Sequence, residues 1–168
     1  AVRVVANGAS LLVMKCIFEL NVGQTGGAIM FTADLSGYLA NGNLVVEHTQ
    51  FRANSASTSG GGVYASTARV TIRDSQFFGN AAGGSLSQFA GGGAIFANGG
   101  TLELKRCTLD SKGFLLAGQN FGAAAESGRL LLLNEVSTWS AEESTIFSPY
   151  TWQSVQSIGS AMEPSIHC

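Results

Sequence analysis

Hydrophobic and polar residues alternate with a period of two in short runs along most of the chain, a pattern typical of strands with one buried face. Four runs begin with an aliphatic pair of this kind: Leu11/Val13, Leu44/Val46, Val70/Ile72 and Leu102/Leu104. In each run the alternation resumes one residue out of phase, at Cys16/Phe18, Thr49/Phe51, Ser75/Phe77 and Cys107/Leu109. The phase shift predicts a bend between two short strands. The Gly and Asn residues between the runs exclude long helices.

The runs belong to an internal repeat with variable insertions. Phe18, Phe51 and Phe77 are followed at the same position by Leu109, with spacings of 33, 26 and 32 residues. A second block lies between the runs, at Gly26–Ile29, Gly61–Tyr64 and Gly92–Ile95. Repeats of this length indicate a solenoid or an array. Because the local period is that of strands, we predict an all-β, right-handed parallel β-helix of about four to five rungs.

Stacking of the rungs predicts columns of equivalent residues about 4.8 Å apart. One aliphatic column contains Leu11, Leu44, Val70, Leu102 and Leu130, and a second contains Val13, Val46, Ile72, Leu104 and Leu132. The Phe residues form a third column. Asn21, Asn54 and Asn80 each follow a Phe by three positions, and we expect them to form a hydrogen-bonded structural ladder at a turn.

The composition changes near the end of these repeats. Residues 1–129 contain nine basic and seven acidic side chains, whereas residues 130–168 contain four Glu and no Lys or Arg. Both Pro and both Trp also lie in the later part. We therefore divide the chain into β-helix repeats over residues 1–137 and a C-terminal cap or partner-docking tail over residues 138–168.

A solenoid exposes unpaired strand edges at its ends, which a cap or a partner must cover. The tail can supply such a cap or bind a partner through Trp139, Phe147, Tyr150 and Trp152, since aromatic residues dominate interface energetics. At the other end, Val4 and Val5 begin the chain in the middle of a repeat, because residues 4–8 match residues 95–99. Val4 and Val5 are therefore further candidates for contact with a protein partner.

Composition excludes several classes of function. The net charge is −2 and charged residues make up 12 % of the chain, so there is no electrostatic footprint for nucleic acid. The longest purely aliphatic run is residues 130–133, which is far too short to span a membrane. The three Cys, at 16, 107 and 168, contain no CxxC pair, so neither a zinc site nor a dense disulfide framework is expected.

One group of charged residues resembles the catalytic clusters of β-helical polysaccharide lyases and hydrolases. Lys15, His48, Asp74 and Arg106 share one outward column, next to Met14, Glu47, Arg73 and Lys105. Asp74, Arg106 and His48 form a candidate acid–base group, with a surface ladder of alternating charge as the other interpretation. Glycoside hydrolysis needs two carboxylates facing one bond, and no second acid stacks on Asp74. We therefore expect no catalytic residue, cofactor or metal.

The alternation of Gly-Gly-Ala-Ile with Phe-x-x-Asn resembles the repeats of chlamydial polymorphic outer membrane proteins and of other secreted β-helix proteins. The matching segments, within residues 4–137, are Gly26–Ile29, Gly61–Tyr64, Gly92–Ile95, Phe18–Asn21, Phe51–Asn54 and Phe77–Asn80. The resemblance implies a β-helical passenger displayed outside the cell and engaged in adhesion. We expect an extracytoplasmic location, whether secreted, on the cell surface or in an organelle lumen.

Three functions follow as hypotheses. The first is a non-catalytic structural module that presents a rigid surface, as an adhesin-like passenger segment or scaffold that binds a protein or a glycan. The second is an accessory subunit of a larger extracytoplasmic or organelle-lumen complex. The third is a carbohydrate-active enzyme that uses Asp74, Arg106 and His48.

Overall fold

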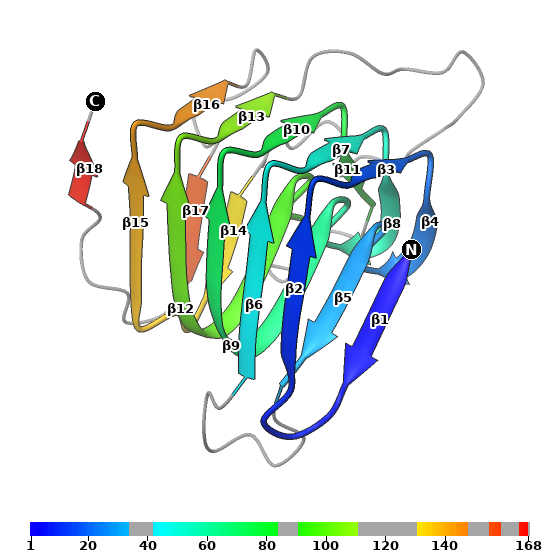
Figure 1. Ribbon diagram of the computed structural model, residues 1–168, viewed down its shortest axis with the longest axis horizontal. Helices are drawn as coiled ribbons and strands as arrows, with labels where there is room; N and C mark the ends of the chain where they lie inside the picture. Colours follow the sequence, from blue (N-terminus) through cyan, green and yellow to red (C-terminus); the bar gives the residue numbers. More distant parts are fainter. Residues whose placement is uncertain (34–41, 84–90, 111–130, 148–154, 159–164, 168) are drawn as a thin grey trace.

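The computed structural model describes residues 1–33, 42–83, 91–110, 131–147, 155–158 and 165–167. All regular elements in these ranges are strands, and the strands pair in parallel in three sheets (Figure 1). The all-β class and the parallel pairing predicted from the alternating pattern are therefore confirmed.

The largest sheet has ten strands. One line of pairing contains β1 (Val2–Val5), β5 (Ile29–Thr32), β9 (Val63–Arg73), β12 (Ile95–Lys105), β14 (Leu131–Asn134) and β17 (Val155–Ile158). The other four strands form a second line along the second halves of β9 and β12. In it β2 (Ser10–Met14) pairs with β6 (Gly42–Glu47), which pairs with β9, and β12 pairs with β15 (Thr138–Glu142), which pairs with β18 (Ser165–His167). The sheet thus has two limbs, which the long strands β9 and β12 join.

The other two sheets are smaller. The five-stranded sheet contains β3 (Ile17–Glu19), β7 (Gln50–Arg52), β10 (Gln76–Phe78), β13 (Thr108–Asp110) and β16 (Thr145–Phe147). The three-stranded sheet contains β4 (Val22–Thr25), β8 (Ser55–Ser59) and β11 (Ala81–Ala82).

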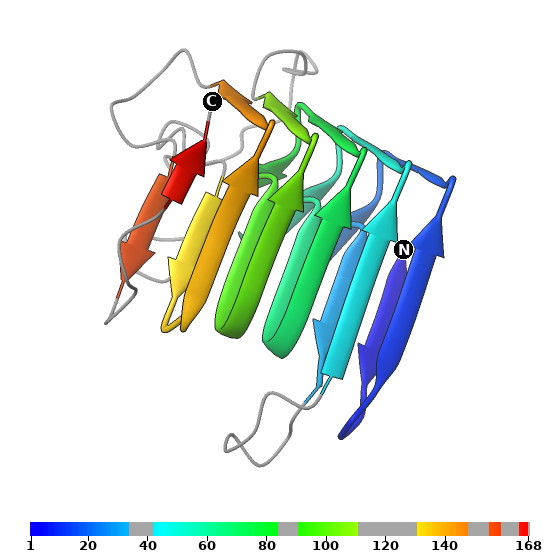
Figure 2. The same cartoon turned by 60° about the vertical axis from the view of Figure 1, so that its left-hand side comes forward.

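The chain visits the sheets repeatedly in the same order, and we call each visit a tier. Tier 1 is β1–β4, tier 2 is β5–β8, tier 3 is β9–β11, tier 4 is β12–β13, tier 5 is β14–β16 and tier 6 is β17–β18. Successive tiers lie side by side along the long axis, so that tier 1 and the C-terminal strands are at opposite ends (Figures 1 and 2). Each tier therefore uses the previous one as its pairing template.

Equivalent inward residues meet in the predicted columns. Phe51 pairs with Phe18 and Phe77, and its ring stacks on theirs at centroid distances of 5.2 and 4.4 Å. Leu44 likewise pairs with Leu11 and Val70. Phe51, Phe77, Leu44 and the inward residues of β9 and β12 are fully buried. Burial of this apolar surface, which no tier achieves alone, is the main source of stability.

The bends between strands use left-handed backbone. The Gly-rich blocks supply one such corner, where Gly26, Gly60 and Gly92 have φ of 63°, 68° and 68°. A Cβ atom at Gly26 would lie 2.2 Å from the Ile29 carbonyl oxygen, so the corner requires glycine. The register places Gly60, rather than Gly61, opposite Gly26, because Val63 pairs with Ile29.

The predicted position of the fifth run is wrong. β14 pairs with residues 95–98 of β12, in the first limb, rather than continuing the columns of the second limb. Trp139 and Ala141 of β15 take the positions opposite Leu102 and Leu104, and Leu130 lies outside the described residues. Four consecutive Leu fit either limb equally well, so the apolar pattern alone did not fix their register.

The predicted register of the first strand is also wrong. Val2, rather than Val4, occupies the position equivalent to Ile95, because two extra residues lie in the turn between β1 and β2. Leu109 is followed in its column by Ile146. Pairing continues through β15–β18, so the sheets do not end at residue 137.

Candidate functional site

The candidate acid–base residues lie at one corner of the fold, where the ten-stranded sheet turns into the five-stranded sheet. Lys15, His48, Asp74 and Arg106 have φ of 54°, 49°, 49° and 50°, so each occupies the same left-handed turn position in its tier. The Asp74 N–H donates to the Lys105 carbonyl, and the other three turns repeat this bond to the next tier. The predicted column is therefore present.

Asp74 and Arg106 form a two-point ion pair within this column. The Arg106 Nε and Nη2 atoms donate to Asp74 Oδ1 and Oδ2 at 2.6 and 2.8 Å. The hydrogen bond from Arg106 lowers the pKa of the Asp74 carboxyl, with smaller lowering by the charges of Arg106, His48 and Arg73. The same bond raises the pKa of Arg106. Asp74 is thus held as a carboxylate.

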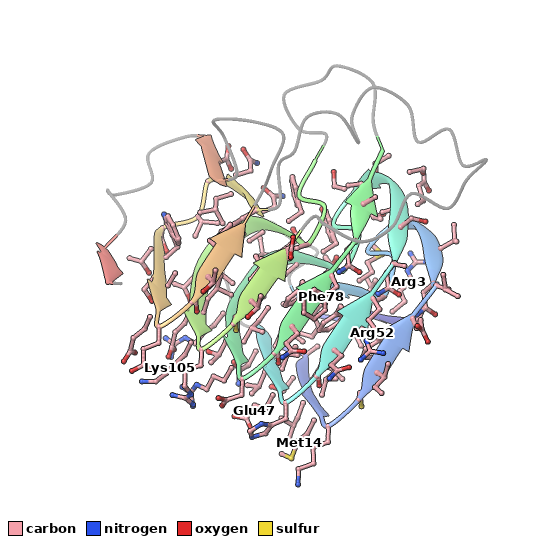
Figure 3. The ribbon with its side chains drawn as sticks, turned by 90° about the horizontal axis from the view of Figure 1, so that it is seen from above. Arg3, Met14, Glu47, Arg52, Phe78 and Lys105 are labelled. Atoms are coloured by element: carbon pink, nitrogen blue, oxygen red, sulfur yellow. The ribbon has the colours of Figure 1, made fainter. Side chains whose placement is uncertain are left out.

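The neighbouring column carries further ion pairs. Met14, Glu47, Arg73 and Lys105 pair in register as predicted, and Met14, Glu47 and Lys105 follow one another along an outer edge in Figure 3. Lys105 Nζ lies 2.9 Å from Glu142, and Arg73 Nη2 lies 3.3 Å from Glu103. Both pairs are partly exposed, and each contributes at most about 1 kcal/mol.

This arrangement does not favour hydrolysis of a glycosidic bond. A general acid must carry a proton at the working pH, whereas the Arg106 ion pair keeps Asp74 ionised. Glu103, an acid in the adjacent outward positions, is itself bound to Arg73. Among the described residues there is no group of three His, Cys, Asp or Glu side chains placed to hold a metal ion.

The three asparagines of the predicted ladder are hydrogen-bonded to one another. Asn54 Oδ1 accepts from the backbone N–H and the Nδ2 of Asn21, at 3.1 and 2.9 Å. Asn80 Oδ1 accepts the same two bonds from Asn54, at 3.0 and 2.9 Å. Asn54 Nδ2 also donates to the Phe18 carbonyl. Because Asn54 is fully buried, the ladder satisfies turn groups that water cannot reach.

A second ladder of hydrogen bonds follows the small inward column of Cys16, Thr49, Ser75 and Cys107 and continues to Ser144. The alternation placed the first four residues inward, but their hydrogen bonds and the position of Ser144 were not predicted. The Thr49 hydroxyl donates to the Glu47 carbonyl at 2.8 Å and accepts the Cys16 N–H at 3.3 Å. Ser75 repeats the pattern with Arg73 and Thr49. The signal was the restriction of this column to hydroxyl and thiol side chains, which are the small residues that both donate and accept.

Cys16 and Cys107 belong to this second ladder and are free thiols. They are three tiers apart. The Cys107 thiol donates to the Ile72 and Lys105 carbonyls, at 3.3 and 3.4 Å, and burial raises the pKa of its thiol. A protonated, buried thiol is a poor nucleophile, so Cys107 is a packing residue. Cys168 lies outside the described residues.

The predicted docking residues of the tail have different outcomes. Trp139 is only 7 % exposed and belongs to the main core cluster, so its prediction as a docking residue is wrong. Its side chain fills the column above Leu102 because β15 extends the sheet. Phe147 pairs with Asp110 through its backbone, and nothing is described of its side chain. Tyr150 and Trp152 lie outside the described residues.

The N-terminal tier presents an apolar surface larger than the predicted pair Val4 and Val5. Val4 is partly buried against the core, and Val5 is 38 % exposed. The remaining exposed large apolar side chains of the described residues are Leu12, Met14, Ile17, Leu20 and Val22, with exposures of 59, 45, 63, 57 and 76 %. Every one of them lies in tier 1 or its turns. We call these six residues, Val5 included, the N-terminal apolar collar.

Comparison with protein-family models, with curated proteins and with solved structures finds no match to this chain. Among the residues that the structure describes, no helix is long and apolar enough to cross a membrane. The candidate function therefore depends on the geometry of the molecule itself.

Proposed function

We propose that the chain is a non-catalytic structural and interaction module, built as a right-handed parallel β-helix, that binds a protein partner at its N-terminal tier. Three parallel sheets visited in a fixed order, and columns of like residues in register, support the β-helix. The stacked Phe rings and the Asn ladder are the contacts through which such a helix holds its tiers together.

The N-terminal apolar collar is the observation that carries the interaction role. Exposed apolar residues occur singly on ordinary surfaces, whereas a group of this size at one end marks a contact surface. The collar residues lie in strands β1–β4 and the turns between them. The outer edges of these four strands have no partner among the described strands. Open, apolar strand edges pair readily with another chain.

The resemblance of the Gly-Gly-Ala-Ile and Phe-x-x-Asn blocks to secreted repeats supports an extracytoplasmic location for this module. There it would act as an adhesin-like passenger or as a subunit of a larger complex. Both roles use the same rigid surface, and the apolar character of the collar favours a protein partner over a glycan. The enzyme hypothesis has less support, because the Arg106 ion pair removes the proton that a general acid needs.

The native mass of this chain in an extract of its source tests the proposal. Light scattering after size separation, with the chain identified by mass spectrometry, is expected to find it in an assembly much heavier than 17.4 kDa. A heavier single polypeptide that carries this sequence would identify a segment of a longer passenger. Elution as a free 17.4 kDa species would contradict the interaction role.

A further inference from the structure

We draw no further inference here: the strongest candidate, the half-buried surface patch that Met30 and Tyr64 form on the outer face of the limb containing β5 and β9, where the Tyr64 ring stacks on that of Phe96, carries none because nothing in the structure shows what covers it.

Discussion

Tier 1 and tier 3 have similar inward side chains and chemically different outward ones. Phe18 and Phe77 occupy the same column, as do Leu11 and Val70. On the outside, Leu12 and Ile17 of tier 1 correspond to Thr71 and Gln76 of tier 3. The inner columns are under one constraint in every tier, because each inward residue must pack on equivalent residues of its neighbours.

The outward side chains do not have to pack on one another, so their polarity can differ from tier to tier according to their surroundings. In tiers 3 and 4 the outer corner is partly exposed, and charges there form ion pairs such as Asp74–Arg106. In tier 1 the outer positions carry the N-terminal apolar collar. The comparison separates two kinds of information in one repeat. The inward pattern encodes the fold, and we propose that the outward pattern encodes the contacts.

Removal of the central Phe ring should give the largest effect on stability. Phe51 is fully buried between the rings of Phe18 and Phe77. Phe51→Ala is expected to lower the free energy of unfolding by about 3–5 kcal/mol. Phe18→Ala, in partly buried tier 1, should cost less, and urea denaturation measures both. Equal losses of stability for the two variants would contradict a structure in which Phe18 stacks on one ring and Phe51 on two.

The Asn ladder provides the next test, at a buried polar position. Asn54→Leu removes the acceptor of two bonds from Asn21 and the donor to the Phe18 carbonyl. Because these groups stay out of water without partners, we expect a loss of about 2–3 kcal/mol in urea denaturation. Asn21→Leu at the exposed end is the control and should cost clearly less. A loss for Asn54→Leu no larger than for the control would rule out the ladder as a support.

The hydroxyl ladder should give a smaller effect. Thr49→Val keeps the shape of the side chain but removes the bond to the Glu47 carbonyl and the acceptor for the Cys16 N–H. The expected loss is about 1–2 kcal/mol in the free energy of unfolding. Thr145→Val, at an exposed position of β16, is the control. Unchanged stability in Thr49→Val would indicate that water replaces the hydroxyl.

The corner ion pair should give the smallest effect, and one that depends on pH. Arg106 lowers the pKa of the folded-state Asp74 carboxyl below the usual 3.8. The contribution of the pair to stability is therefore fully present above about pH 4 and is lost as the pH falls through the lower folded-state pKa. Melting temperatures of the natural chain and of Asp74→Asn should differ slightly at neutral pH and converge in acid. A difference that grows in acid would contradict this sign.

The inner columns were predictable from the sequence because a period of two and a recurring Phe-x-x-Asn leave few registers. The corner residues were predictable for the same reason, since one extra residue separates the two phases of each run. The positions of β14 and Trp139 were not, because a run of Leu satisfies both limbs of the large sheet. Only the bend at Glu135, with φ of 52°, and the pairing beyond it fix the register.

The candidate contact surface was only partly predictable. An open N-terminal edge followed from Val4 and Val5, but the collar became visible only when outward residues were compared tier by tier in register. Leu12 and Ile17 look like ordinary strand residues when each run is read separately. Their exposure depends on knowing which side of the strand carries Leu11 and Phe18.

Hydrogen–deuterium exchange of the native assembly against the isolated chain measures most directly whether tier 1 is the docking end. We predict that peptides covering residues 10–22 gain protection in the assembly, while peptides covering residues 68–78 of tier 3 exchange equally in both states. Gained protection confined to tier 3, with tier 1 unchanged, would contradict the account.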